Sequence, residues 1–281
     1  MKRILCIQDL ATVGRSSLAV VSPVLSVMGY QCCPLPTALL STHTGGFAPV
    51  ERLDATGFFS AALEAYRAQE IAFDAVYTGY LCSPAQAAVA ADELRRCGAA
   101  LRVTDPAMAD NGRLYGGFGP EMVEAMQTLC GEAGLITPNA TEAALLAGEQ
   151  PRERYGADEV EALCERLAGR YGARVVITGA PLEGGQTVCV GRGEAAWEHF
   201  TLRCSYVDAA YPGTGDLFCA VLTGALMRGN ALQSAAELAL RFTENAARAT
   251  FAARRDPRFG LEFEPLLGEL LPPREEPSWA R

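Results

Sequence analysis

The chain has 281 residues, a formal net charge of −9, and 49% hydrophobic residues. The acidic balance excludes a general nucleic-acid binder, because a phosphate backbone requires a basic surface. No apolar run is long enough to span a membrane, and the start of the chain does not resemble a signal peptide. The ten cysteines then indicate a reduced, cytoplasmic protein. We expect a single domain over residues 1–271 and a flexible tail over residues 272–281.

Strand-like and helix-like segments alternate along the chain. The predicted strands are residues 2–7, 31–35, 38–40, 75–78, 101–104, 135–137, 175–178, 187–191 and 195–202. The predicted helices are residues 17–28, 51–69, 84–97, 122–129, 141–146, 160–171, 217–227 and 235–253. This alternation predicts a three-layer α/β/α fold with a mainly parallel central sheet. The last two strands predict a small antiparallel edge.

Polar residues follow several predicted strands at the edge of the sheet where open α/β proteins bind ligands. They are Gln8-Asp9, Thr78-Gly79-Tyr80, Asp105 to Asp110, Thr137-Pro138-Asn139 and Thr178-Gly179. Each segment taken singly is compatible with an ordinary strand-to-helix turn. Five such loops on one edge, together with the glycine-rich turn described next, indicate a ligand site.

Gly213, Thr214, Gly215 and Asp216 precede an apolar helix pattern, so the glycines lie at a helix N-terminus. Unpaired amides and the helix dipole bind anions there, and glycine allows the backbone to approach a bound anion closely. A carboxylate in such a cradle suits a base that takes a proton from a hydroxyl attacking a phosphate. The alternative is a simple helix cap, since Thr and Asp both cap helices.

Lys2 is the only lysine of the chain. The chain therefore has neither the P-loop sequence GxxxxGK[ST] nor the strand lysine of protein kinases. Any phosphoryl transfer would depend on backbone amides, a metal ion and arginine.

Six motifs, in order, make the chain similar to the pyridoxal (vitamin B6) kinases of the ribokinase-like superfamily. They are Ile7-Gln8 with Gly14, LSTHTG at 40–45, YTGY at 77–80, DPAMAD at 105–110, ITPN at 136–139 with Glu142, and GTGDLF at 213–218. The resemblance extends from Ile7 to about residue 250 and implies the ribokinase-like form of the α/β/α fold.

The resemblance implies ATP-dependent phosphorylation of the 5′-hydroxymethyl group of pyridoxal, pyridoxine and pyridoxamine, in salvage of pyridoxal phosphate. Asp216 would be the base, and the amides of Gly213, Thr214 and Gly215 would form an anion hole. Comparable donors contribute about 3–4 kcal/mol each. A carboxylate with an ordinary pKa of about 3.9 is a weak base, which suffices where the transition state is loose.

The same resemblance implies the nucleotide and metal contacts. ATP would be held by Asp105, Tyr115, Thr137, Asn139, Thr178 and Gly213, with Tyr115 in a mobile flap over residues 112–119. Mg²⁺ would be held by Asp105, Asp110 and Glu142, directly or through water, because it prefers hard oxygen ligands in octahedral geometry. A turn before proline is the alternative interpretation of Asp105.

For the vitamin, the family pattern marks His43, Thr44 and Tyr80, with a structural histidine, helix capping and packing as the alternatives. The chain departs from the family at Asp9-Leu10, where Ser-His is usual. Asp9 places a carboxylate beside the pyridine ring, where it can pair with a protonated ring nitrogen or an aminomethyl group. We therefore expect some preference for pyridoxamine.

The nearest alternative is a hydroxymethylpyrimidine kinase of thiamin synthesis, which belongs to the same superfamily. The alternative from another class is a non-catalytic vitamin or nucleotide sensor, and the intact Asp216 with its flanking glycines argues against it. The resemblance also implies a homodimer. Dependence on a monovalent cation stays open.

Overall fold

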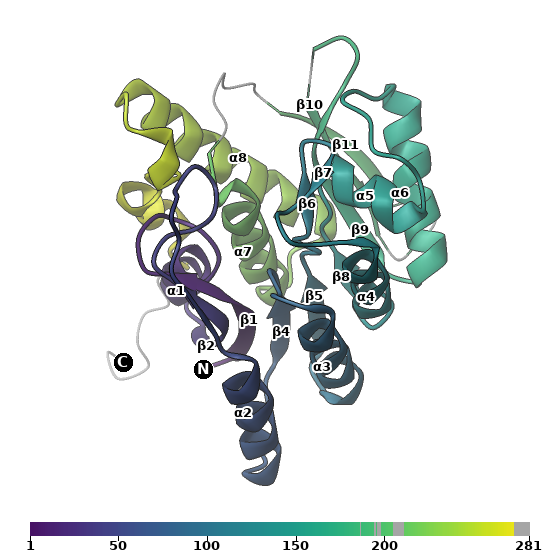
Figure 1. Ribbon diagram of the computed structural model, residues 1–281. Helices are drawn as coiled ribbons and strands as arrows, with labels where there is room; N and C mark the ends of the chain where they lie inside the picture. Colours follow the sequence, from purple (N-terminus) through teal and green to yellow (C-terminus); the bar gives the residue numbers. More distant parts are fainter. Residues whose placement is uncertain (186, 194, 196–197, 205–210, 273–281) are drawn as a thin grey trace, which may run out of the picture.

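Helices cover both faces of one central sheet, so the predicted three-layer α/β/α fold is confirmed (Figure 1). The computed structural model describes residues 1–185, 187–193, 195, 198–204 and 211–272. Over these ranges, no helix is long and apolar enough to cross a membrane. The predicted tail at 272–281 lies, from residue 273 onward, outside the described residues, and the single-domain boundary stays a prediction.

The sheet has the strand order β11-β10-β9-β8-β5-β4-β1-β2-β3 in the described part of the chain. Its strands are β1 (Arg3–Ala11), β2 (Gln31–Leu40), β3 (Arg52–Asp54), β4 (Ala75–Thr78), β5 (Leu101–Thr104), β8 (Leu135–Ile136), β9 (Arg174–Pro181), β10 (Thr187–Arg192) and β11 (His199–Cys204). Neighbours from β9 to β2 run parallel, whereas β10 and β11 at one edge and β3 at the other are antiparallel. A separate hairpin joins β6 (Ala109–Asp110) to β7 (Arg113–Leu114).

Two hydrophobic cores lie on the two sides of the sheet. The helices are α1 (Leu18–Val27), α2 (Thr56–Ala68), α3 (Pro84–Arg96), α4 (Pro120–Cys130), α5 (Ala140–Ala147), α6 (Ala157–Tyr171), α7 (Thr214–Met227) and α8 (Leu232–Ala252), with 3₁₀ segments η1 (Pro257–Phe259) and η2 (Glu264–Leu270). Helices α1, α7 and α8 share one core, and α2 to α6 the other. Strand β1 serves both, because Ile4 and Cys6 point to the first core while Leu5 and Ile7 point to the second.

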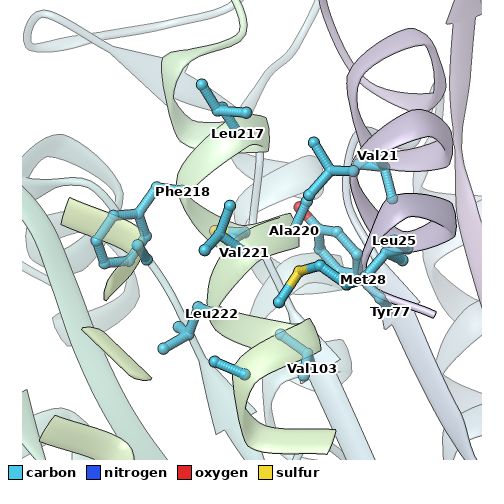
Figure 2. Close-up of a cluster of buried hydrophobic side chains, with 14 of the residues drawn as sticks. Val21, Leu25, Met28, Tyr77, Val103, Leu217, Phe218, Ala220, Val221 and Leu222 are labelled. Atoms are coloured by element: carbon cyan, nitrogen blue, oxygen red, sulfur yellow. The ribbon is translucent and has the colours of Figure 1, made fainter. Parts of the chain in front are cut away.

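Helix α7 is the buried element that carries Asp216. Its apolar side chains pack between the sheet and α1 (Figure 2). Gly224 permits the close approach of α1, since a Cβ at this position would overlap the Met28 sulfur. The Tyr30 hydroxyl also donates to the Gly224 carbonyl over 3.0 Å. Packing along the whole of α7 therefore holds its first turn, with Asp216, in a fixed position.

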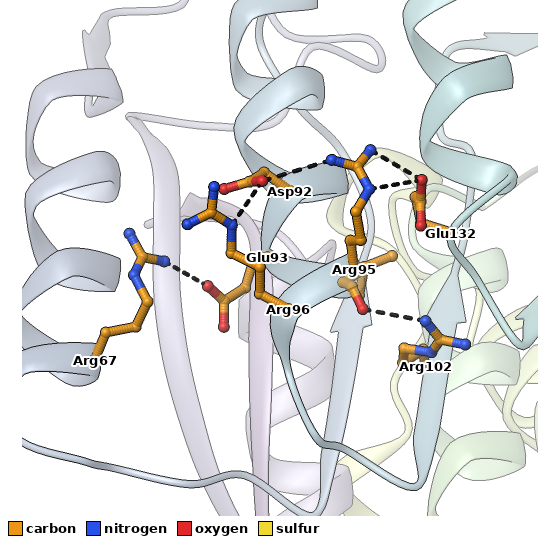
Figure 3. A network of polar contacts seen from close by, with 8 residues as sticks. Arg67, Asp92, Glu93, Arg95, Arg96, Arg102 and Glu132 are labelled. Atoms are coloured by element: carbon orange, nitrogen blue, oxygen red, sulfur yellow. Dashed lines mark hydrogen bonds and ion pairs between the residues drawn. The ribbon is translucent and has the colours of Figure 1, made fainter.

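Ion pairs join the helices on the other side of the sheet (Figure 3). Arg67 on α2 contacts Glu93 on α3 over 2.8 Å, and Arg95 on α3 contacts Glu132 after α4 over 2.9 Å. The Arg95–Glu132 pair lies at the surface, where such pairs contribute about 0–1 kcal/mol, whereas the Arg67–Glu93 pair has a buried carboxylate. They align neighbouring helices, and none lines the cavities described below.

Several predicted boundaries are wrong. Strand β1 extends to Ala11 and strand β9 to Pro181, so Gln8-Asp9 and Thr178-Gly179 lie inside strands instead of following them. Strand β2 is continuous over Gln31–Leu40 although it contains two prolines. Both prolines precede the residues that pair with β3, so the missing N–H groups interrupt no hydrogen bond to that outer strand. The predicted helix at 51–69 begins only at Thr56, because residues 52–54 form the edge strand β3. The predicted strand at 195–202 is described as β11 from His199, and residues 196–197 lie outside the described residues.

Candidate active site

Two adjoining cavities open at the carboxyl ends of the parallel strands, a large chamber of about 790 Å³ and a small chamber of about 440 Å³. The residues that line both are Ala107, Asp110, Tyr115, Tyr211, Pro212, Gly213 and Asp216. All of the site residues predicted from the sequence line one chamber or both. Two ligands bound in these chambers would therefore meet beside Asp216.

The glycine-rich turn forms the N-terminus of α7 as predicted. Gly213 is the N-cap residue with φ 78°, a left-handed conformation that favours glycine. A Cβ there would also overlap the Arg15 carbonyl oxygen, so a side chain has no room. The N-terminus of this 14-residue helix thus lies where the two chambers meet, and its free amides and dipole make this end attractive to an anion.

Asp216 is held by a residue far away in the chain. Its Oδ2 atom accepts a hydrogen bond of 2.8 Å from the backbone N–H of Ser17. Ser17 reaches this position with φ 47°, an uncommon value for a residue with a side chain. Burial raises the pKa of Asp216 to about 6, the Ser17 amide opposes the rise, and the charge of Asp9 adds to it. Asp216 is therefore ionised above about pH 6 and is a stronger base than an ordinary aspartate.

Asp105 lies behind Asp216 in the small chamber. Burial, followed by the negative charge of Asp216, raises the pKa of Asp105 to about 8. Without a cation nearby, Asp105 is consequently protonated at neutral pH. A cation bound between the two carboxylates would favour the ionised form of both.

The three predicted metal ligands are not gathered around one point. Glu142 closes a capping box at the start of α5, with Asn139 as its partner, and its carboxylate also accepts from the amides of Met108 and Ala109. The Asp110 carboxylate is turned toward Asn111. No three His, Cys, Asp or Glu side chains form a metal-binding group in the described part of the chain. The oxygens of Asp105 and Asp110 fit Mg²⁺ in type, whereas Glu142 is occupied in holding their loop, and the ligand set stays a prediction.

The small chamber has the chemistry of a nucleotide site. It is lined by Thr137 after β8, Asn139 at the start of α5 and Thr178 within β9, together with the α7 N-terminus. Its other wall comes from α8, through Leu240, Thr243, Glu244 and Ala247. The chamber thus combines apolar surface of α8, suited to a nucleotide base, with hydroxyls and the backbone amides of the α7 N-terminus, suited to phosphates.

His43 has both ring nitrogens engaged within the protein. Its Nε2 donates to the Arg258 carbonyl over 2.6 Å, and its Nδ1 accepts from the Gly45 amide over 3.1 Å. This pattern requires the neutral tautomer, and burial lowers the pKa of the imidazole accordingly. The ring also lies against Gly14, where a Cβ would overlap it. His43 thus adopts the arrangement of the structural alternative while it lines the large chamber.

Three aromatic rings pack together beside the large chamber. Tyr80 stacks on Phe118 with ring centroids 5.6 Å apart, and Tyr115 lies 6.4 Å from each of them. Tyr115 follows the β6–β7 hairpin and lines both chambers. The segment 112–119, which was predicted to cover the nucleotide, therefore also lies close to Tyr80 in the large chamber.

Residues 24–258 match the family described as phosphomethylpyrimidine kinase, which is most of the chain. The chain belongs to the phosphomethylpyrimidine kinase family. A pyridoxine/pyridoxal/pyridoxamine kinase of Bordetella avium is 30% identical over 99% of this chain and 91% of its own length. The expected kinship with vitamin B6 kinases of the ribokinase-like superfamily is thereby confirmed.

Two solved structures share the fold of this chain over nearly its full length. A protein of Bacteroides thetaiotaomicron assigned to the phosphomethylpyrimidine kinases, in a crystal form with pyridoxal, is 39% identical with a TM-score of 0.91, over 96% of this chain and 95% of its own. The pyridoxal kinase of Lactobacillus plantarum is 32% identical with a TM-score of 0.89, over 96% of both chains.

Several lining residues of this family member were not predicted from its sequence. Leu240, Thr243 and Ala247 recur at helical spacing, and this spacing is the signal that could have marked the α8 wall. Nothing in the sequence indicated Ser17, because it contacts Asp216 through its backbone N–H, which every residue except proline has. Arg52 was placed in a helix, and only the edge strand β3 brings it to the large chamber.

Proposed function

We propose that this protein transfers the γ-phosphate of ATP to the 5′-hydroxymethyl group of the vitamin B6 vitamers pyridoxal, pyridoxine and pyridoxamine. The observation that carries the proposal is the meeting of two chambers at Asp216 and the α7 N-terminus. The vitamer would occupy the large chamber and ATP the small one. The pyridoxal and pyridoxine kinases among the relatives support this choice of substrate.

In the reaction, the vitamer oxygen forms a bond to the γ-phosphorus as the bond to the bridging β,γ-oxygen breaks, and ADP leaves. Asp216 accepts the hydroxyl proton, for which its pKa of about 6 leaves it ionised at neutral pH. The amides of Gly213, Thr214 and Gly215 stabilise charge on the transferred group. Ser17 keeps the base in place through its amide. A Mg²⁺ ion, which Asp105 and Asp110 would hold, supplies charge neutralisation for the phosphates.

The alternative substrate is hydroxymethylpyrimidine, whose hydroxymethyl group would suit the same base. The name of the family supports it, whereas the vitamin B6 kinases among the relatives support the vitamers. A non-catalytic sensor is not supported, because Asp216 and its flanking glycines form an intact cradle.

The test is ATP-dependent phosphorylation of pyridoxal, pyridoxine, pyridoxamine and hydroxymethylpyrimidine by the wild type and by Asp216→Asn. We expect vitamer turnover that falls at least about 100-fold in the variant, because the substitution removes the base and leaves the shape. Thermal unfolding of both proteins serves as the folding control. Turnover of the pyrimidine alone would refute the vitamer assignment.

Three further properties rest on the resemblance and on composition. We propose a homodimer, a cytoplasmic location and the absence of nucleic-acid partners. Light scattering after size-exclusion chromatography tests the first, and a mass of one chain near 29.8 kDa would contradict it.

A further inference from the structure

Asp9 is a buried carboxylate in the wall of the large chamber, where it is 3% exposed. It lies at an irregular point of the β1–β2 pairing, between Gln8 and Leu10. No ion pair reaches it from the described residues. Burial raises the pKa of Asp9, and hydrogen bonds from Ser17 and from its own backbone oppose the rise. A buried carboxylate without a cation is costly, which makes this wall attractive to a positively charged hydrogen-bond donor.

Arg52 supplies the opposite charge in the same chamber. It pairs with Leu40 across the β2–β3 ladder, and both residues line the chamber because paired residues share one face of the sheet. Within the described part of the chain, the Arg52 guanidinium makes no ion pair or hydrogen bond. Its neighbour Asp54 is occupied by the amide and hydroxyl of Thr56. The guanidinium is thus available to an anionic group of a ligand.

Asp9 and Arg52 line the same chamber without forming an ion pair. Burial raises the pKa of Asp9, and the charge of Arg52 acts in the opposite direction. Because no ion pair joins the two side chains although both line the large chamber, space remains between them. A ligand that fits this space carries a cationic N–H and an anionic oxygen on one small ring. A 3-hydroxypyridine has this form when its ring nitrogen takes the proton of its hydroxyl group.

We propose that the large chamber selects the zwitterionic form of the vitamer, with Asp9 accepting from the protonated ring nitrogen and Arg52 donating to the ionised 3-oxygen. This inference rests on the proposed function and names the feature of the substrate that the chain recognises. A hydroxymethylpyrimidine has no such oxygen, so the Asp9–Arg52 pair also separates the two candidate substrates. The earlier expectation of a preference for pyridoxamine loses its basis, because all three vitamers share the ring nitrogen and the 3-oxygen.

The first test compares pyridoxine with 3-deoxypyridoxine, which lacks the 3-oxygen, in the wild type and Arg52→Met. We expect the variant to lose about 10–100-fold in kcat/KM for pyridoxine and less than about twofold for 3-deoxypyridoxine, since only pyridoxine has the charge-assisted hydrogen bond to lose. Arg52→Lys should restore part of the loss. Equal losses for both substrates would overturn the inference. Turnover of pyridoxine by the wild type would still support the proposed function in that case.

The matched control is Arg113→Met, which removes the same charge from the β6–β7 side of the chamber. It should change the two substrates by the same factor, and a selective loss for pyridoxine would overturn the assignment to Arg52. The partner of Asp9 is tested with 4-deoxypyridoxine, which keeps the ring nitrogen but has no polar 4-substituent. Asp9→Asn should impair 4-deoxypyridoxine and pyridoxamine alike, and a loss confined to pyridoxamine would overturn the ring-nitrogen contact.

A second readout does not depend on turnover. Ionisation of the 3-hydroxyl moves the absorption band of the ring to longer wavelength, so pyridoxine bound to the wild type without ATP should show this band. Arg52→Met should weaken the band at saturating pyridoxine. A bound spectrum of the neutral form in the wild type would overturn the proposal.

Discussion

Replacing Asp105 by Asn removes a carboxyl group whose pKa burial and the charge of Asp216 raise from 3.8 to about 8. The folded protein keeps this proton up to about pH 8, whereas the unfolded chain has released it above about pH 4. Unfolding therefore releases a proton between these limits, and the free energy of unfolding falls by about 1.4 kcal/mol per pH unit. From pH 6 to pH 8, the loss due to Asp105 amounts to about 2 kcal/mol.

The Asn side chain keeps the shape without the titration. Urea unfolding at pH 6, 7 and 8, without nucleotide or metal, should therefore show the stability of Asp105→Asn relative to the wild type rising by about 2 kcal/mol across the range. Asp256→Asn is the control, because hydrogen bonds from Arg258 lower the pKa of Asp256 and keep it ionised in both states at these pH values. A stability difference for Asp105→Asn that stays constant with pH would refute the buried, protonated Asp105.

Other predictions concern single contacts of the site and its support. Gly213→Ala should reduce kcat by at least about 100-fold, because its Cβ overlaps the Arg15 carbonyl and displaces the anion cradle; unchanged steady-state kinetics would contradict this. The kcat/KM profile should fall on the acid side near pH 6 as Asp216 gains a proton, and Asp9→Asn should shift that limb to lower pH by removing a charge that raises the pKa. Tyr30→Phe should cost about 1 kcal/mol in the free energy of unfolding through the lost bond to the Gly224 carbonyl, as urea titration would show.

The sequence located structural features correctly where they lie in one local segment. Gly213 and Asp216 belong to one turn, so the helix N-terminus that carries them could be recognised from adjacent residues, while their roles stay predictions. The fold class followed similarly from alternating strands and helices, which are local patterns of hydrophobic periodicity. The prediction failed at edges: no pattern within residues 51–55 reveals a three-residue strand whose formation depends on pairing with Ala38 to Leu40.

The sequence by itself determined the chemical groups of this protein: the glycine-rich turn, the buried strands and the carboxylates that follow them. Only the tertiary structure decided how these groups act on one another. The Ser17 amide donates to Asp216, which lies 199 positions away in the chain. The pKa of Asp105 rises only on folding, because folding buries the carboxyl group and brings the charge of Asp216 close to it. The physical reason is that desolvation and Coulomb interactions depend on distance in space, whereas a motif records only distance along the chain.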